Sequence, residues 1–300
     1  NITVVTCSMN RNHQLKKNIL AAQNIKNLYR HIIIDYSSEL PVSSFLDVVP
    51  KNVFIYRINN QKIWWLTRAY NAAFELVDTD FTFKLDADVE IDFDFFNDMD
   101  YEEYDHILFT NNNNDSGNFL VKTNLLKGVN GFNEYILRGY NDHDLLNRIK
   151  YKNVNINTHT VFNKIKKDDH PDELRVRGIS SKYLKKNKNF YYGLVKGYND
   201  YHGLISKNNL WSNQKKIYKI KDYDITIEHL YTSSDLSLKI KLKCKIIFLK
   251  TFFRIYYRNE NTFKAKLVKR ILPYILYFLS QKFIKKYFGI IIFPSEEIVI

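Results

Sequence analysis

The chain has 300 residues, enough for one large α/β domain of about 250 residues or for two domains of about 100–200 residues. Its 45% hydrophobic, 15% aromatic and 26% charged residues are typical of a folded globular protein, which excludes the disordered, collagenous and coiled-coil classes. The net charge of +13 is one-sided, because residues 1–175 carry 20 Lys and Arg against 24 Asp and Glu, whereas residues 176–300 carry 25 against 8. The basic half indicates an anionic partner, either a phospholipid surface or nucleic acid, although the Lys-rich and Asn-rich usage of an AT-rich genome would also produce it.

The cysteine content and the hydropathy indicate the compartment in which the protein is expected. Cys7 and Cys244 lie far apart, so the sequence offers neither a disulfide framework nor a CxxC zinc site, and a reducing, cytoplasmic compartment is expected. The first residues lack the basic, apolar and small-residue order of a secretory signal. The longest uncharged apolar run, between Arg270 and Lys282, is shorter than the ~20 residues of a spanning helix, so we do not expect an integral membrane protein.

The first half of the chain alternates short apolar, β-branched runs with segments of helical period, which predicts an α/β fold with a mostly parallel central sheet. Strands are expected at 2–7, 31–34, 53–57, 81–85, 107–110 and 118–122, and helices at 13–25, 66–77 and 142–151. In open α/β sheets ligands bind beyond the carboxyl ends of the strands. We therefore expect one rim to gather the polar residues that follow the strands, namely Asn10, Arg11, Asp35, Asp86 and Asp88.

The charge changes sign near residues 175–181, which predicts one domain over 1–175 and a basic, aromatic-rich region over 176–300. Helix-length stretches make that region mainly helical, whereas Leu236–Ile246 alternates with period two and is left open between strand and helix. Basic residues interleaved with apolar ones at near-helical spacing are typical of helices that lie in a membrane interface. A solvated helical bundle that caps the first domain is the alternative.

Two carboxylates one residue apart, Asp86 and Asp88, follow the strand in the segment FKLDADVE (83–90). Both can approach a divalent cation such as Mg²⁺ or Mn²⁺, which takes oxygen ligands and neutralises a diphosphate. An acidic surface loop is the alternative, since such tripeptides are common on solvated turns. The motifs GxxxxGK[ST], GxGxxG, HExxH and GxSxG are absent, which argues against P-loop, dinucleotide-binding, zincin and hydrolase sites.

A second acidic cluster lies in NEYILRGYNDHDLLNR (133–148), where a helix is expected to begin. The helix dipole favours carboxylates there by about 0.3–1 kcal/mol, so capping alone would explain Asp142 and Asp144. The functional interpretation is that Asp142, beside the turn of Gly139 and Tyr140, is a general base for a sugar hydroxyl. His170 follows in the polar turn DDHP (168–171), and imidazole can join carboxylates around Mn²⁺.

Four motifs resemble, in the right order, the inverting, metal-dependent GT-A glycosyltransferases of family 2, especially their galactosyltransferase-like branch. The segment VVTCSMNR (4–11) is similar to that family's first strand and nucleotide loop, and HIIIDYSS (31–38) to its uracil-binding strand end. The pair WWLTRAYNAAFE and FTFKLDADVEID (64–75 and 81–92) resembles its RAxN and DxD stretch. The segment VNGFNEYILRGYNDHDLLNRI (129–149) resembles its GGFnE and ED motif.

The resemblance covers residues 1–175 and implies a GT-A, Rossmann-like catalytic domain. It implies that Asp35 contacts uracil and Asp86 ribose, within a nucleotide-sugar site made by Thr6, Asn10, Arg11, Asp35, Arg68, Asn71 and Asp86. It also implies that Asp88 and His170 hold Mn²⁺ or Mg²⁺, that Asp142 is the general base, and that the acceptor is bound by Tyr140 and Asp144. One departure is that Asn141 stands where the family has a Glu before the catalytic Asp, and the preceding Gly is absent.

We therefore expect an inverting glycosyltransferase that moves a hexose from a UDP-sugar to a saccharide or glycolipid acceptor and lies peripherally on the inner face of the cell membrane. A nucleic-acid-binding protein that uses the basic half is the alternative from another class, with an affinity that would fall steeply with salt, although nucleic acid is not the expected partner. A catalytically inactive nucleotide-sugar-binding module is a second alternative. A sugar-phosphate nucleotidylyltransferase would need a Gly-rich loop after the first strand, and residues 8–11 contain no Gly.

Overall fold

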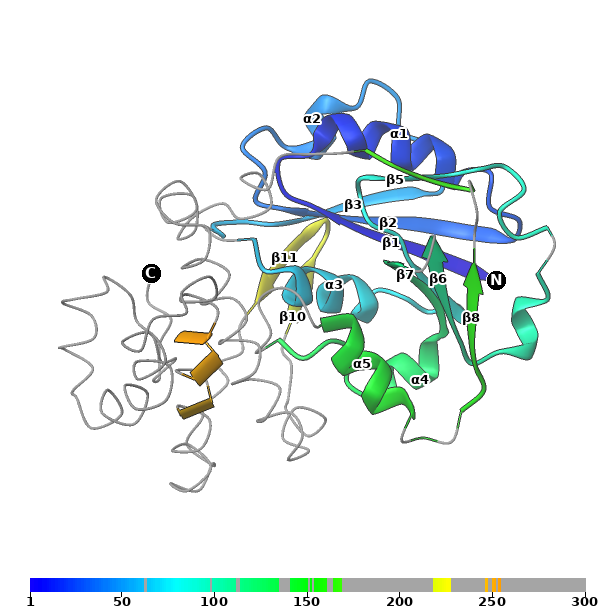
Figure 1. Ribbon diagram of the computed structural model, residues 1–300. Coiled ribbons are helices and arrows are strands. Elements are labelled where there is room, and N and C mark those ends of the chain that lie inside the picture. The colour runs from blue at the N-terminus through cyan, green and yellow to red at the C-terminus, as the bar shows by residue number, and fades with distance from the viewer. Residues whose placement is uncertain are drawn as a thin grey trace. The chain divides into compact units, whose positions relative to one another are not determined.

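The computed structural model in Figure 1 divides the chain into two compact units. The first spans Asn1–Glu134, Asn141–Gly178 and Lys215–Glu228, and the second holds the remaining residues. The structure describes residues 1–61, 64–97, 99–111, 114–134, 141–150, 152, 154–160, 164–168 and 218–227 of the first unit, and 246–247, 250–251 and 253–254 of the second, which are helical. Among the described residues, no helix has both the length and the apolar character needed to cross a bilayer.

A nine-stranded sheet organises the first unit, in the order β10-β11-β3-β2-β1-β4-β7-β6-β8. Five of its neighbouring pairs are parallel, and the pairs β4–β7, β6–β7 and β10–β11 are antiparallel. The predicted α/β fold with a mostly parallel sheet is therefore confirmed. The strands are β1 (Ile2–Ser8), β2 (Leu28–Tyr36), β3 (Val53–Ile58), β4 (Phe81–Lys84), β6 (His106–Asn111), β7 (Asn114–Lys122), β8 (Ile156–Thr160), β10 (Tyr218–Lys221) and β11 (Asp224–Ile227).

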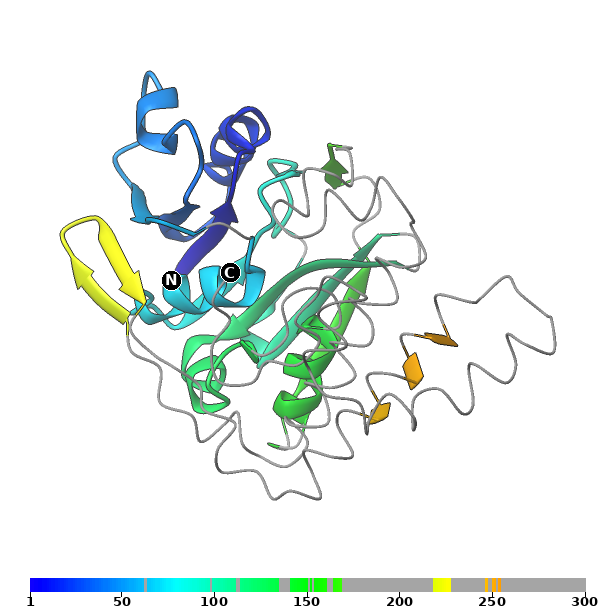
Figure 2. The ribbon, with the colours of Figure 1, turned by 90° about the vertical axis from the view of Figure 1, so that its left-hand side faces the viewer.

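Helices cover both faces of this sheet. Figures 1 and 2 show α1 (Asn12–Ala22) and α2 (Val42–Phe45) on one face, and α3 (Leu66–Glu75), α4 (Thr123–Gly128) and α5 (Asn141–Lys150) on the other. In α1 the buried apolar residues Leu15, Ile19 and Ala22 recur at helical spacing, which is why this segment folds as a helix against the sheet. A short 3₁₀ helix lies at Tyr101–Glu103.

A second, two-stranded sheet lies directly after the DxD segment. It pairs β5 (Val89–Ile91) with β9 (Ile165–Lys167) in antiparallel register, Val89 opposite Lys167. Residues far apart in sequence, 89–91 and 165–167, are thereby brought together. The pairing places the chain that precedes residue 168 beside the DxD segment.

Most predicted elements of the first half lie where the sequence places them. The strands expected at 2–7 and 53–57 are β1 and β3, and the helix expected at 66–77 is α3. The strand expected at 31–34 is longer, because β2 already begins at Leu28. Residues 218–227, which fall beyond the expected boundary at 175, extend the first unit's sheet through parallel pairing of β11 with β3. The division at 175 and the mainly helical character of 176–300 stay predictions.

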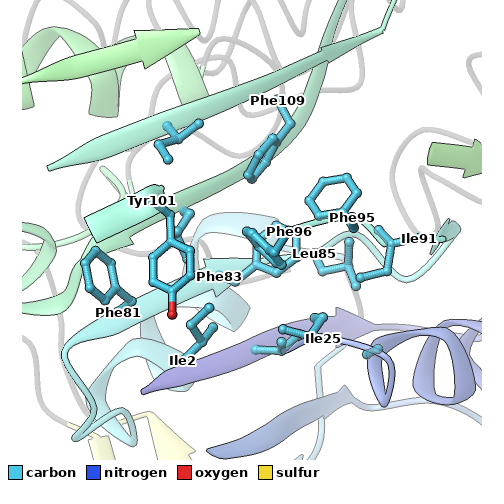
Figure 3. Packing of buried hydrophobic residues seen from close by; sticks show 14 of the residues in the cluster. Ile2, Ile25, Phe81, Phe83, Leu85, Ile91, Phe95, Phe96, Tyr101 and Phe109 are labelled. Carbon is cyan, nitrogen blue, oxygen red and sulfur yellow. The ribbon is translucent and has the colours of Figure 1, made fainter. Parts of the chain in front are cut away.

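An aromatic cluster fills the α1 side of the sheet around β4 (Figure 3). Phe83 has no exposed surface and contacts three other rings, with centroid distances of 5.8 Å to Phe95, 5.4 Å to Phe96 and 5.5 Å to Phe109. Ring pairs at such distances add stabilisation beyond the area that they bury. The cluster anchors β4 and the segment after it, and hence the strand end that carries the DxD residues.

Phe83→Ala is expected to lower the free energy of unfolding by about 3–5 kcal/mol, because it removes a fully buried ring and leaves a cavity. Phe93→Ala is the matched control, since 74% of Phe93 is exposed and the same substitution should change stability by no more than about 0.5 kcal/mol. Denaturant unfolding of both variants measures the difference. Equal stability of the two variants would contradict the assigned core.

Candidate functional site

The carboxyl ends of β1, β2 and β4 lie at one edge of the sheet, because these three strands are parallel neighbours. In register, Ser8 lies opposite Asp35, and Val5 lies opposite Lys84. Polar residues follow each of these strands, as the sequence predicts. In parallel α/β sheets this edge is where ligands bind.

At the end of β2, Asp35 fixes the loop that follows. Its carboxylate accepts hydrogen bonds from the backbone N–H groups of Ser38 at 2.9 Å and Val42 at 3.1 Å, and from the guanidinium of Arg57. Only 2% of its side chain is exposed. The structure thus gives Asp35 a bracing role at the strand end, and its expected contact with uracil stays a prediction.

The loop after β1 is joined to the same strand end. Asn10 has a φ of 58°, and its backbone N–H donates to the hydroxyl of Ser38 at 3.0 Å. Its side-chain oxygen accepts the backbone N–H of Glu39 at 2.7 Å. Asn10 is therefore brought beside the Asp35 loop, in agreement with the expected rim.

Asn18 of α1 connects the first strand to the DxD segment. Its amide donates to the backbone oxygens of Asp86 at 3.1 Å and Val89 at 2.7 Å, and its oxygen accepts the hydroxyl of Thr6 at 3.3 Å. On the other side, the backbone N–H of Asp86 donates to Asn118 at 2.7 Å. Thr6 is fully buried, and its expected place in the nucleotide-sugar site stays a prediction.

A buried ammonium lies at the end of β4. Lys84 is 1% exposed and donates to the Asp86 carboxylate at 2.8 Å and to the backbone oxygen of Gly117. The carboxylate of Asp142 lies 4.0 Å from the same ammonium. Tyr70 donates its hydroxyl to Asp86 at 3.0 Å. Asp86 and Asp142, predicted to be functional from separate motifs, are thus gathered around one charge.

The opposite charges of Lys84 and Asp86 each stabilise the charged form of the other side chain. Burial lowers the pKa of Lys84, but the nearby charges of Asp86 and Asp142 and the hydrogen bond to Asp86 outweigh it, so the pKa of Lys84 lies above its usual value. For Asp86, burial raises the pKa. The charge of Lys84 and the hydrogen bond from it lower the pKa by more, so the pKa of Asp86 lies below its usual value. Lys84 is therefore an ammonium and Asp86 a carboxylate at neutral pH.

Asp88, the expected metal ligand, lies close to the chain that leads to His170. Its side chain is 4% exposed and lies 3.8 Å from the guanidinium of Arg11. Its backbone oxygen accepts the N–H of Asp168 at 2.9 Å, and His170 follows two residues later, outside the described residues. Within the described part of the chain no three His, Cys, Asp or Glu side chains form a group that could hold a metal.

A divalent cation does not need three protein ligands. Mg²⁺ is usually held by one or two carboxylates together with phosphate oxygens of the substrate, rather than by a cage of protein ligands. The carboxylate of Asp88 is chemically suited to be such a ligand, and its role as one stays a prediction. An imidazole two residues after Asp168 would add a donor that Mn²⁺ accepts.

Arg68 and Asn71 of α3 lie against residues 132–134. The guanidinium of Arg68 lies over the Trp65 ring, 3.6 Å from its centroid, and 3.6 Å from the carboxylate of Glu134. Asn71 is fully buried and donates to Glu134 and to the backbone oxygen of Phe132, both at 2.8 Å. The structure brings these two residues together through Glu134, and their contact with a nucleotide stays a prediction.

The two carboxylates of the first turn of α5 differ in surroundings. Asp144 is 9% exposed and is ion-paired with Arg148 one turn later, at 2.8 Å. Asp142 is 33% exposed and lies on the side of Lys84 and Gly117. Tyr140 lies outside the described residues. Of the two carboxylates, Asp142 is the one that combines access to solvent with proximity to the DxD strand end.

No protein-family model and no curated protein matches this chain. Among solved structures it is similar to residues 1–349 of TarS from S. aureus, with a TM-score of 0.48 and 12% identity over 85% of this chain and 81% of that one. It is similar to glucosyl-3-phosphoglycerate synthase from Mycobacterium tuberculosis, solved with Mn²⁺, UDP and phosphoglyceric acid, with a TM-score of 0.49 and 12% identity over 77% and 87%.

A third similar structure is the mannosyltransferase PcManGT from Pyrobaculum calidifontis, solved with GDP-Man and Mn²⁺, with a TM-score of 0.49 and 10% identity over 69% of this chain and 64% of that one.

Lys84, Gly117 and Asn18 also line the candidate site, and none of them was predicted from the sequence. A signal for Lys84 was present, because this lysine lies within the mostly apolar run FTFKL (81–85), at the end of a strand in which every residue is buried. A buried lysine needs partners of opposite charge. No pattern in the sequence indicated Asn18, since a single Asn in an amphipathic helix is ordinary.

Proposed function

We propose that the chain is an inverting, GT-A type glycosyltransferase that moves a hexose from a UDP-sugar to a saccharide or glycolipid acceptor. The observation that carries the proposal is that Asp142 lies beside the DxD strand end, 4.0 Å from the ammonium that also binds Asp86. A donor-side carboxylate and a partly exposed second carboxylate on one edge of a parallel sheet suit a transfer between two bound substrates. The sequence resemblance to family 2 supports the same reaction.

The reaction needs a base for the acceptor. As the acceptor oxygen attacks the anomeric carbon, the bond from that carbon to the UDP oxygen breaks, and Asp142 takes the hydroxyl proton. Attack from the side opposite to UDP inverts the configuration, so no covalent intermediate is needed. Asp144 is less suited to this role, because its carboxylate is bound to Arg148.

The donor side needs positive charge where negative charge develops on UDP. Charge neutralisation of the diphosphate is what Mn²⁺ or Mg²⁺ supplies when bound. Asp88 and His170 are the residues that would hold the ion, and Asp86 would orient the ribose. The guanidinium of Arg11, 3.8 Å from Asp88, is a further positive group at this position.

Release of UDP from a panel of UDP-sugars in the presence of Mn²⁺ and saccharide acceptors tests the function. We expect release from at least one UDP-hexose. Binding of UDP with no turnover of any donor would favour the inactive binding module. Absence of UDP binding, together with salt-sensitive binding of nucleic acid, would favour the nucleic-acid-binding alternative.

Gly117→Ala is expected to lower kcat/KM at least ~10-fold, a transition-state loss of about 1.4 kcal/mol. Gly117 has a φ of 73°, which strains any other residue, and a Cβ atom there would lie only 3.3 Å from Asp86 Oδ2, so the added methyl group displaces the Asp86 carboxylate. Gly128→Ala is the control, since a Cβ atom at Gly128 meets nothing within 4 Å. Steady-state kinetics of both variants measure the effect, and normal kinetics of Gly117→Ala would contradict this geometry.

We also propose that the basic region 176–300 binds an anionic membrane surface, where a glycolipid acceptor would be found. Its 25 Lys and Arg against 8 Asp and Glu support this placement, since each basic residue near such a surface contributes ~1 kcal/mol. Flotation with vesicles tests it, and we expect recovery on anionic vesicles only. Equal recovery on neutral and anionic vesicles, or recovery on neither, would rule it out.

A further inference from the structure

Lys84 occupies an unusual place for a lysine. It lies in β4, a strand of four residues that are all buried, and only 1% of its side chain is exposed. The desolvation of an ammonium in a protein interior is costly unless opposite charges and hydrogen-bond acceptors surround it. A sheet position of this kind is filled at lower cost by an apolar residue, so the charge calls for an explanation.

The contacts of Lys84 come from separate parts of the chain. Asp86, at 2.8 Å, follows β4 itself, the backbone oxygen of Gly117 belongs to β7, and Asp142, at 4.0 Å, belongs to α5. The rings of Tyr70 and Phe119 lie 4.7 Å and 5.8 Å from the ammonium. Aromatic faces at such distances attract a cation and keep water away from it.

Two carboxylates that approach each other in a partly desolvated site repel. Asp86 and Asp142 both come within 4 Å of the position of a Cβ atom on Gly117, so they face the same small space. An ammonium that lies 2.8 Å from one carboxylate and 4.0 Å from the other offsets this repulsion.

We propose that Lys84 is a positioning residue for the transfer reaction, and that its ammonium holds the base Asp142 in place against the donor-side carboxylate Asp86. This role rests on the proposed function, since it takes Asp142 as the base. Lys84 contacts neither substrate in this account and acts through the two carboxylates. It couples α5, which carries the base, to the strand end that binds the nucleotide sugar.

A double-mutant cycle on kcat tests the proposal. Lys84→Met keeps the apolar length of the side chain and removes the charge, and we expect it to lower kcat at least ~10-fold in the wild-type background, since one misplaced catalytic group has effects of that size. In the Asp142→Asn background the same substitution should lower kcat less than ~3-fold, because residues that act as a unit are not additive. A purely structural role of Lys84 would reduce kcat by equal factors in both backgrounds.

Lys122→Met is the matched control, because Lys122 lies on the neighbouring strand β7 and is ion-paired with Asp105 at 2.9 Å. It should leave kcat unchanged in both backgrounds. If Lys84→Met does not fold, as judged by its thermal unfolding, Lys84→Arg replaces it in the same cycle with the same criterion, since it keeps the charge but moves it. A wild-type kcat in the Lys84 variant, or an equal fold reduction of kcat in both backgrounds, would overturn the role of Lys84. The proposed function would be unaffected by either result. Absence of UDP release by the wild-type protein from every UDP-sugar would overturn the proposed function, and this role with it.

Discussion

Asp142→Asn is expected to lower kcat by at least ~10²-fold, the typical contribution of a positioned general base. An acceptor hydroxyl is too weakly acidic to attack unaided at neutral pH, and the amide keeps the size of the side chain while it removes the basicity. Because the proposed role of Asp142 is on the acceptor side, the affinity for UDP should stay near that of the wild type. Steady-state kinetics and calorimetry with UDP measure the two quantities separately.

Asp105→Asn is the control for this variant, since Asp105 is 27% exposed and ion-paired with a lysine, as Asp142 is 33% exposed and near one. Asp105 directly precedes β6, and the activity of Asp105→Asn should equal that of the wild type. Asp144→Asn distinguishes the two carboxylates of the helix. Normal turnover of Asp142→Asn together with an inactive Asp144→Asn would show that the base is the other carboxylate. Normal activity of both Asp142→Asn and Asp144→Asn would show that these two carboxylates only cap the helix.

The sheet could be predicted because most of its strands are rich in apolar, β-branched residues and are followed by polar residues. β1 and β2 have this pattern over several residues, and both were found. β8, β9 and β10 were not predicted, since their sequences INTHT, IKK and YKIK are too short or too polar to show a strand period. Such strands form because a neighbouring strand offers hydrogen bonds. The partner of β8 lies 50 residues earlier in the chain and that of β9 lies 74 to 78 residues earlier, so neither leaves a local trace.

The roles of the candidate site residues stay predictions, and most of their contacts could not be predicted from the sequence. The DxD carboxylates and Asp142 could be named from strand ends and helix starts. That Asp35 braces its own loop, with Ser38 and Val42 as donors, could not be foreseen, because the partners depend on how the chain turns after β2. No role could be predicted for Lys84, because the role proposed for it depends on its proximity to Asp142, which lies 58 positions further along the chain.

Removal of the divalent cation is the second change with a large expected effect. EDTA in excess should abolish turnover, and Asp88→Ala should lower kcat/KM at least ~10²-fold, a transition-state loss of about 2.7 kcal/mol. The physical reason is that UDP leaves with two phosphates, and their charge must be neutralised in a site where Asp86 and Asp142 already contribute negative charge. Asp88 is the carboxylate at the strand end whose backbone is bonded to Asp168, two residues before His170.

Two measurements separate a metal ligand from a structural residue at this position. Calorimetry with Mn²⁺ in the presence of UDP should show weaker binding of the ion to Asp88→Ala and to His170→Ala, whereas Asp94→Ala, which removes a carboxylate ion-paired with Lys164 at 3.2 Å, should bind it normally. Thermal unfolding of Asp88→Ala should show a folded protein, because the partner of Asp168 is the backbone oxygen of Asp88, which the substitution keeps. Full turnover in EDTA would remove the ion from the mechanism. Wild-type Mn²⁺ affinity of His170→Ala, with weakened affinity of Asp88→Ala, would leave Asp88 as a ligand and remove His170, since the diphosphate oxygens then complete the coordination.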